Sequence, residues 1–225
     1  MKFGVLRFPG SCDEVDALLA CKRFAEAELL WHADRDLRGA DAIVIPGGFS
    51  YGDYLRAGAI ARFSPVMEAV REFAIDGGPV LGICNGFQIL CEAGLLPGAL
   101  RPNASLAFVC RDVRLTVERA DTPFTAECER GQELVIPVKH GDGSWFADDE
   151  LYGELLANGQ IVLRYAEACN GSLHDVAGVT NEAGNVFGLM PHPEHAVDPL
   201  LGSSDGALVL GSLVSAARDR LGAPV

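Results

Sequence analysis

The first half of the chain alternates short apolar runs with segments of helical periodicity, and this alternation constrains the fold more than any other feature. Short apolar runs bounded by turn residues predict strands, and here they occupy residues 3–8, 28–31, 42–46 and 79–83. Between the last two, Ser64-Pro65 predicts the start of a helix and Gly77-Gly78 its end. Strands separated by helices predict an α/β fold with a mostly parallel central sheet flanked by helices.

The second half is richer in strands. We expect strands at residues 106–118, 133–139 and 161–165, and an antiparallel hairpin made by DVAGVTN and NVFGLM around an EAG turn. From about Asp205 an amphipathic stretch predicts a closing helix. Its apolar positions are Leu208, Leu210, Leu213, Val214, Ala217 and Leu221. Since no linker or repeat interrupts the 225 residues, we expect one domain over residues 1–225.

Charge and cysteine usage exclude several classes of protein. A net charge of −13 with only three lysines argues against a nucleic-acid partner. The seven cysteines form no C-x-x-C pair and have no metal-ligand spacing, which favours reduced thiols, a cytoplasmic location and no metal site. No stretch approaches the ~18 consecutive apolar residues of a membrane span, and the first residues lack a signal-peptide core.

Cys84 is the candidate nucleophile. It lies between Gly82 and Gly86, where a predicted strand meets a predicted helix, and this G-x-C-x-G spacing is typical of a nucleophile elbow. Such a turn exposes the side chain above the sheet edge, and the positive end of the helix dipole favours the thiolate. The Asn85 N–H is then a candidate donor of an oxyanion hole.

A histidine and a carboxylate near the end of the chain are the candidate partners of that thiol. In Met190-Pro191-His192-Pro193-Glu194, the prolines restrict the preceding residues to extended geometry. Residues two apart in an extended segment project to the same side, so His192 and Glu194 are expected together and His195 on the opposite side. We therefore predict a Cys84–His192–Glu194 triad, with the carboxylate orienting the imidazole.

A glycine-rich loop, residues 45–58, follows a predicted strand. It does not fit the G-x-x-x-x-G-K-[ST] pattern of a phosphate-binding loop, so this chain is not expected to bind ATP there. At the carboxyl edge of a parallel sheet the loop lies beside the elbow. The backbone N–H of Gly48 is the candidate second oxyanion donor.

These motifs together resemble those of class I glutamine amidotransferases of the triad type, and more narrowly the glutaminase subunits of phosphoribosylformylglycinamidine synthase. The similarity runs essentially end to end, through the segments at residues 46–67, 82–100, 108–113 and 188–196. The resemblance implies a flavodoxin-like fold with an added antiparallel section. One departure is that the family reads F-P-G-S-N-C-D where this chain has Phe8-Pro9-Gly10-Ser11-Cys12-Asp13, without the asparagine. We assign that loop no site role.

The resemblance also implies a chemistry. Cys84 attacks the side-chain carboxamide of glutamine, His192 protonates the departing ammonia, and water resolves the glutamyl thioester. Gln88 and the segment Lys139-His140-Gly141 match positions that hold the substrate glutamine, so Gln88, His140 and Gly141 are candidate binding residues. For His140, a plain loop histidine is an equally open interpretation.

The implied partners follow from the same family. Ammonia passes to a large synthetase subunit that uses ATP and magnesium to convert formylglycinamide ribonucleotide (FGAR) to the amidine (FGAM) in de novo purine synthesis, and a small third subunit bridges the two. This chain itself is expected to hold no cofactor. Asp53, Tyr54 and Arg56 are candidates for signalling to the synthetase, although Arg56 could equally be a surface ion-pair residue.

Two other readings remain open. A free-standing cysteine hydrolase of the dienelactone type shares G-x-C-x-G, but it carries its acid before its histidine, whereas His192 here precedes Glu194. A catalytically silent scaffold of the same fold is disfavoured because all three triad residues are intact. A glutaminase assay distinguishes these alternatives.

Overall fold

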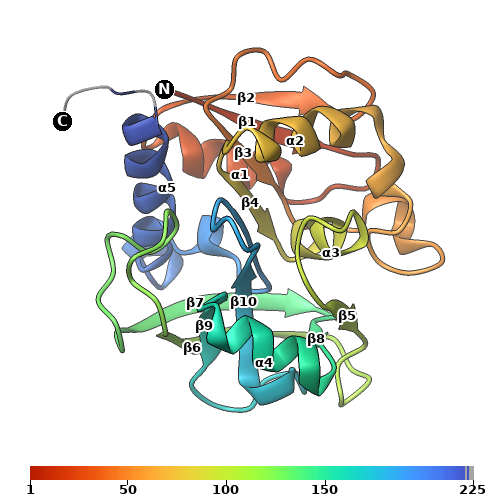
Figure 1. The fold of residues 1–225 in the computed structure, drawn as a ribbon, viewed down its shortest axis with the longest axis vertical. Coiled ribbons are helices and arrows are strands. Elements are labelled where there is room, and N and C mark those ends of the chain that lie inside the picture. Colours follow the sequence, from red (N-terminus) through yellow and green to blue (C-terminus); the bar gives the residue numbers. More distant parts are fainter. Residues whose placement is uncertain (221, 223–225) are drawn as a thin grey trace.

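A nine-stranded sheet forms the centre of the molecule in the computed structural model, which describes residues 1–220 and residue 222. The strand order is β2-β1-β3-β4-β11-β10-β9-β6-β7. Figure 1 shows how the helices lie around these strands. The first five strands in this order pair in parallel and the rest pair antiparallel. Their bounds are β1 Lys2–Arg7, β2 Glu26–Trp31, β3 Ala42–Ile45, β4 Val80–Ile83, β6 Val109–Val117, β7 Glu133–His140, β9 Ile161–Tyr165, β10 Val176–Thr180 and β11 Val186–Leu189.

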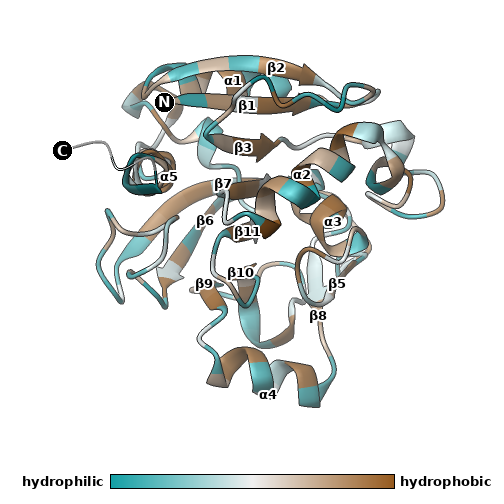
Figure 2. Cartoon of the chain, turned by 45° about the horizontal axis from the view of Figure 1, so that its top comes forward, coloured by the Kyte–Doolittle hydropathy of each residue, from teal (hydrophilic) through white to brown (hydrophobic). Residues whose placement is uncertain are grey.

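The predicted fold class is confirmed. The four strands expected in the first half are β1 to β4, in the order 2-1-3-4 that flavodoxin-like sheets share. Every residue of β3 and β4 is buried, as expected for strands covered on both faces, and Figure 2 shows the apolar colouring of β3. The expected hairpin is the antiparallel pair β10 and β11.

The described residues form five α-helices. The helix predicted after Ser64 is α2, and it buries Val66, Met67, Val70 and Ala74. α1 contacts β1 and β2, α3 contacts β3, β4 and β11, and α5 contacts β3 and β7. The closing helix is confirmed through residue 220, whereas Leu221 lies outside the described residues. The bounds are α1 Glu14–Lys22, α2 Pro65–Ile75, α3 Asn85–Glu92, α4 Asp149–Ala157 and α5 Gly206–Arg220.

Some elements were not predicted. These are α4 and a small antiparallel sheet of β5 (Ala99–Arg101) and β8 (Ser144–Phe146). Short 3-10 helices also occur, and two of them matter for the site: η1, Ser50–Asp53, and η4, Pro193–His195. The others are η2 Ala61–Phe63, η3 Leu173–Asp175 and η5 Pro199–Leu201.

The antiparallel half of the sheet curls back toward β4. Four strands separate β4 from β7 in the sheet order. Even so, the His192 N–H, just past β11, donates to the Pro137 carbonyl of β7 at 2.8 Å. The Lys139 carbonyl of β7 lies 3.8 Å from the Cys84 sulfur, which follows β4. This curl brings residues from β4, β7 and the end of β11 to one place.

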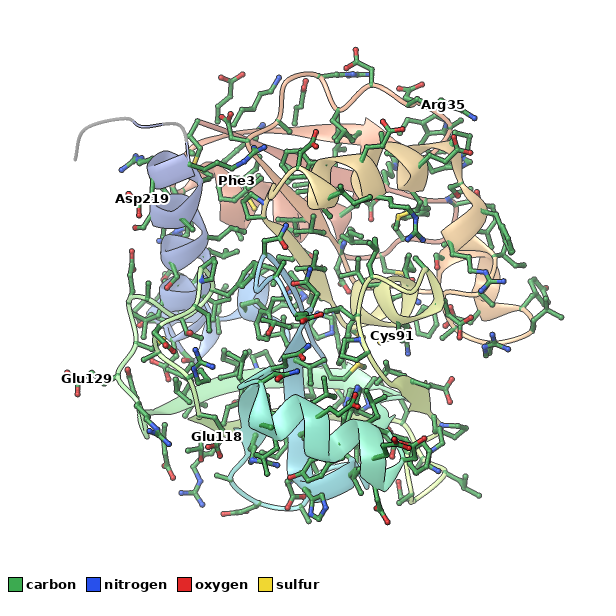
Figure 3. All side chains as sticks on the ribbon, in the orientation of Figure 1. Phe3, Arg35, Cys91, Glu118, Glu129 and Asp219 are labelled. Carbon is green, nitrogen blue, oxygen red and sulfur yellow. The ribbon has the colours of Figure 1, made fainter. Side chains whose placement is uncertain are left out.

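The surface is charged and the interior apolar. Arg35, Glu129 and Asp219 project from the periphery, whereas Phe3 on β1 is fully buried (Figure 3). Among the described residues, no helix combines the length and the apolar character that crossing a membrane requires.

Candidate active site

The predicted elbow is present at Cys84, which caps α3 with φ 51° and ψ −103°. A positive φ is uncommon for a residue with a side chain, so the backbone is strained at this residue. The flanking glycines are required for space. A Cβ on Gly82 would lie 2.8 Å from the Gly86 backbone, and a Cβ on Gly86 would lie 2.0 Å from the Ile45 oxygen. Only glycine lets the helix start this close to β3 and β4.

His192 and Glu194 are brought together as predicted, but by a different local geometry. The His192 Nδ1 lies 2.7 Å from the Glu194 Oε1, and both residues are buried. The expected extended segment is wrong, because Pro193 starts the 3-10 turn η4. The tighter turn also places His195 beside His192, with ring centroids 5.4 Å apart, so its predicted opposite orientation is wrong as well.

The surroundings of His192 favour the imidazolium form. Burial lowers the pKa of His192, but the Glu194 carboxylate and the Cys84 thiol outweigh burial and raise that pKa to about 10. Within the described part of the chain, the buried Nε2 has no partner with full hydrogen-bond geometry. The charge of Cys84 acts on the ring in the same direction as that of Glu194. The three predicted triad residues therefore form one interacting group.

A cavity of about 130 Å³ opens at the Cys84 thiol. Its wall includes five of the residues that the sequence analysis selected besides Cys84: Gly48, Asp53, Gln88, His140 and Gly141. Tyr54 and Arg56 are not part of this wall; their side chains are exposed on the same loop. The remaining lining residues are Cys12, Asp13, Phe49, Phe108, Lys139 and Asp142.

The two candidate oxyanion donors come from the glycine-rich loop and from the first residue of α3. Gly48 has φ 140°, and a Cβ there would lie 2.5 Å from the Cys12 nitrogen, so only glycine fits. Asn85 is the first residue of α3, where the backbone N–H has no intrahelical acceptor. The Asn85 side chain accepts from the Ser50 N–H at 3.1 Å and donates to the Asp53 Oδ1 at 3.2 Å. It thereby joins the glycine loop to the helix that carries the nucleophile.

Among the candidate binding residues, Gln88 and His140 are both engaged within the protein. The Gln88 amide donates to the Asp142 carbonyl at 2.6 Å. The His140 Nδ1 lies 3.0 Å from the Asn103 Oδ1, and its Nε2 lies 3.5 Å from the Asn170 amide nitrogen. Burial, together with the charge of His192, lowers the pKa of His140 to about 4, so the ring is neutral at pH 7. Each of the two asparagines begins an N-x-S triplet, a pattern that says nothing about this site, and the sequence analysis assigned them no role in it.

The loop that follows the glycines is strained and exposed. Tyr51, Asp53 and Leu55 all have positive φ, and the side chains of Tyr54 and Leu55 project into solvent. Arg56 makes a two-pronged ion pair with Glu92, with nitrogen–oxygen distances of 2.5 and 2.6 Å. For Arg56 this geometry matches the ion-pair interpretation.

Asp13 and His195, to which the sequence analysis assigned no role, form a cluster with His192 and Glu194. Asp13, His192, Glu194 and His195 each present an atom within 4.8 Å of the others. These atom types are also metal ligands. However, Asp13 accepts a hydrogen bond from the Lys139 ammonium, and Glu194 is hydrogen-bonded to His192. Ion pairing and hydrogen bonding therefore account for the cluster without a metal.

Known proteins that share this sequence and fold identify the class of enzyme to which the chain belongs. A family model described as a CobB/CobQ-like glutamine amidotransferase domain matches residues 1–205. The class is therefore that of the glutamine amidotransferases. A glutamine amidotransferase structure from Thermotoga maritima, 17% identical with a TM-score of 0.61 and covering 97% of both chains, shares the fold.

Closer relatives narrow the class to one family. The chain is 59% identical over 219 residues to the phosphoribosylformylglycinamidine synthase subunit PurQ of Rubrobacter xylanophilus, covering 97% of this chain and 100% of that protein. It is 53% identical to the PurQ subunit of Salinibacter ruber, covering 95% and 96%. A chain of the PurLQS structure from Thermotoga maritima superposes with a TM-score of 0.88 at 44% identity, covering 95% and 97%. The chain belongs to the PurQ family, the glutaminase subunits of phosphoribosylformylglycinamidine synthase.

Proposed function

We propose that this glutaminase subunit of purine biosynthesis hydrolyses glutamine through a thioester on Cys84. The observation that carries the proposal is the strained Cys84 thiol acting on a buried imidazole whose Nδ1 is held by Glu194 at 2.7 Å. In such an arrangement the carboxylate orients the ring and the ring exchanges protons with the nucleophile and the leaving group. We further propose that residues 1–225 act as one glutaminase domain.

In the first half of the reaction, the Cys84 thiolate attacks the side-chain carboxamide carbon of glutamine. The carbonyl oxygen becomes negative and accepts from the backbone N–H groups of Gly48 and Asn85. The His192 imidazolium then donates its Nε2 proton to the departing nitrogen. Ammonia leaves, and a glutamyl thioester remains on the sulfur.

In the second half, the neutral His192 takes a proton from water as the water oxygen attacks the thioester carbon. The same oxyanion donors stabilise the second tetrahedral intermediate. The carbon–sulfur bond breaks, glutamate is released, and His192 and Cys84 return to the imidazolium and thiolate forms. Glu194 holds the same Nδ1 proton throughout, so the ring keeps one orientation.

The cavity wall supports a role in binding glutamine. Gln88 and Gly141 face the cavity beside the thiol, together with the Lys139 and His140 stretch of β7. The His140 ring is committed to Asn103 and Asn170, so we assign it the task of holding this wall in place. Specific contacts to the amino acid then come from the backbone of residues 139–142 and from Gln88.

Exposed apolar side chains in the segments that contribute to the cavity wall support docking to a synthetase. Phe49, Tyr54, Leu55, Leu106 and Phe108 are all exposed, between 49% and 92% of their surface. Phe49 and Phe108 also line the cavity. We propose that the large synthetase subunit, which uses ATP and magnesium to convert FGAR to FGAM, covers these exposed side chains and receives the ammonia, with a small bridging subunit completing a complex like PurLQS.

The experiment that tests the proposal is glutamine-dependent ammonia release by the chain mixed with its synthetase and bridging subunits. We expect native protein to release ammonia, Cys84→Ala to release none, and Cys84→Ala complexes to form FGAM when free ammonia is supplied. Covalent trapping of a glutamyl group on Cys84, detected by mass spectrometry, identifies the intermediate. Ammonia release that survives Cys84→Ala would overturn the proposal, and its absence from the native complex would leave the hydrolase or scaffold reading.

A further inference from the structure

We propose that Asp13, paired with Lys139, is a positioning residue that sets the pH range over which Cys84 and His192 exist as a thiolate–imidazolium pair. The proposal rests on the proposed function for the roles of those two residues. It assigns a task to a carboxylate and an ammonium that the reaction steps above do not use.

The carboxylate of Asp13 lies against the ring of the base. Asp13 is 4% exposed, its Oδ2 lies 3.8 Å from the His192 Nδ1, and its Oδ1 lies 3.5 Å from the His195 Nε2. The Oδ1 also accepts from the Lys139 ammonium. At 3.8 Å the Asp13 oxygen acts on His192 through charge, while Glu194 at 2.7 Å keeps the hydrogen bond to Nδ1.

The backbone holds Asp13 at this distance. Its N–H donates to the Gly47 carbonyl at 3.3 Å, and its carbonyl accepts from the Ala17 N–H in α1 at 2.8 Å. Gly47 has no room for a side chain, because a Cβ there would lie 2.5 Å from the Asp13 Oδ2 and 2.7 Å from the His192 Cε1. The absence of a side chain at residue 47 therefore lets the carboxylate and the imidazole lie side by side.

Lys139 links the Asp13 carboxylate and the His192 ring to the nucleophile, Cys84. Burial lowers the pKa of Lys139. The hydrogen bond to Asp13 and the charges of Asp13, Glu194 and Cys84 outweigh burial and raise that pKa. Burial alone would raise the pKa of Asp13, yet the nearby His195 ring and the hydrogen-bonded Lys139 ammonium keep it well below its usual range. Both groups are therefore charged at pH 7, and both line the cavity with the thiol.

The charges around the reacting pair predict the direction of each effect. An ammonium favours the thiolate and disfavours the imidazolium, and a carboxylate does the opposite. Removing the Asp13 charge leaves the Lys139 ammonium without its counter-charge, so the titrations of the Cys84 thiol and the His192 ring both move to lower pH. Removing the Lys139 charge moves both to higher pH. The other titratable groups that face the pair or line the same cavity remain in both variants; they are Glu194, His195, His140, Cys21, Tyr165, Cys12, Asp53 and Asp142.

The test is the pH dependence of Cys84 alkylation by iodoacetamide in the full-length chain, followed on the Cys84 peptide by mass spectrometry. We expect the pH of half-maximal rate to fall by about half a unit or more in Asp13→Asn and to rise by a similar amount in Lys139→Gln. The matched control is Glu14→Gln, which removes the neighbouring buried carboxylate that pairs with Arg7 at 3.3 Å. This control should leave the half-maximal pH unchanged.

A second readout separates this proposal from the proposed function. In the assembled complex, both limbs of the pH profile of glutamine hydrolysis should move down for Asp13→Asn and up for Lys139→Gln. Unchanged midpoints, or equal shifts in Glu14→Gln, overturn the role of Asp13 even if ammonia is released. If the alkylation midpoints of the two variants shift in opposite directions but the complex releases no ammonia, the role of Asp13 and Lys139 is supported and the glutaminase assignment is contradicted. If one of the two variants fails to fold, the midpoint shift of the other variant tests the proposal.

Discussion

The site is tightly packed at Gly47, since the Asp13 carboxylate and the His192 ring both occupy the space of its missing side chain. Gly47→Ala should push both groups away and lower glutamine hydrolysis about 100-fold, because small displacements of a catalytic group are costly. The measurement is ammonia release, with circular dichroism to show that the fold persists. Activity close to native would mean that the ring tolerates displacement and that its observed position is not required.

Asp53 is a half-buried carboxylate whose ionisation opposes folding. Burial raises its pKa from 3.8 to about 6, against the hydrogen bond from Asn85, and the Asp142 charge adds to the rise. Since the folded-state pKa is above the unfolded one, this group favours folding below about pH 4, and the benefit is lost as pH rises through 6.

Asp53→Asn should therefore unfold at a higher temperature than native protein at pH 7.5, with a difference that shrinks toward pH 4. Solvent screening keeps the effect small, on the order of a few degrees. Melting curves at the two pH values measure it. A difference that grows as the pH falls would contradict the sign.

At the residue scale, local spacing predicted the triad but not its surroundings. Cys84, His192 and Glu194 lie in short motifs whose geometry depends on adjacent glycines and prolines. Asp13 comes from the other end of the chain, and backbone hydrogen bonds with Gly47 and Ala17 hold it beside His192. Charge pairs between residues this distant, such as Asp13 and Lys139, leave no periodic signal in one sequence.

Among the elements, α4 offers a substitution that should stabilise the protein without touching the site. Asp148 caps this helix by accepting from the Leu151 N–H at 2.9 Å, and Gly153 lies exposed in its middle with no atom within 4 Å of an added Cβ. Gly153→Ala should add about 0.5–1 kcal/mol, because alanine loses less backbone entropy on folding. The unfolding temperature should rise by about 2–4 °C, and ammonia release should not change. A lower unfolding temperature would show a steric cost that the structure does not contain.

The elements also show where pattern-based prediction ends. Buried strands such as β3 and β4 were predicted because continuous apolar runs are conspicuous. By contrast, α4 was missed because its segment, residues 149–157, includes Gly153 and buries only Leu155. The turn η4 was read as extended from its prolines, whereas Pro193 is equally suited to the first position of a helical turn. That difference reversed the predicted orientation of His195.

For the whole molecule, the curl of the antiparallel half decides whether a site forms at all. The resemblance to the family predicted an antiparallel section but no route for β7 from the far edge of the sheet back to the thiol. That return depends on contacts between β7 and the segment after β11, such as the His192 N–H to the Pro137 carbonyl. Long-range pairing of this kind is set by packing of the whole sheet.

Net charge is the remaining property of the whole molecule with a measurable consequence. With −13 formal charges, repulsion over the surface opposes the compact state. Surface ion pairs such as Arg114 with Glu133 offset little of it, because exposed pairs contribute about 0–1 kcal/mol. Raising sodium chloride from 0.01 M to 0.15 M shortens the screening length from about 30 Å to about 8 Å.

At pH 7.5 this change in salt should therefore raise the unfolding temperature by about 2 °C or more. Near pH 5, close to the isoelectric point of about 4.7, the same salt step should have much less effect, because little net charge remains to be screened. Differential scanning calorimetry at the two pH values makes the comparison. A lower unfolding temperature in salt at pH 7.5 would mean that favourable ion pairs outweigh the repulsion, and that the acidic surface stabilises this fold.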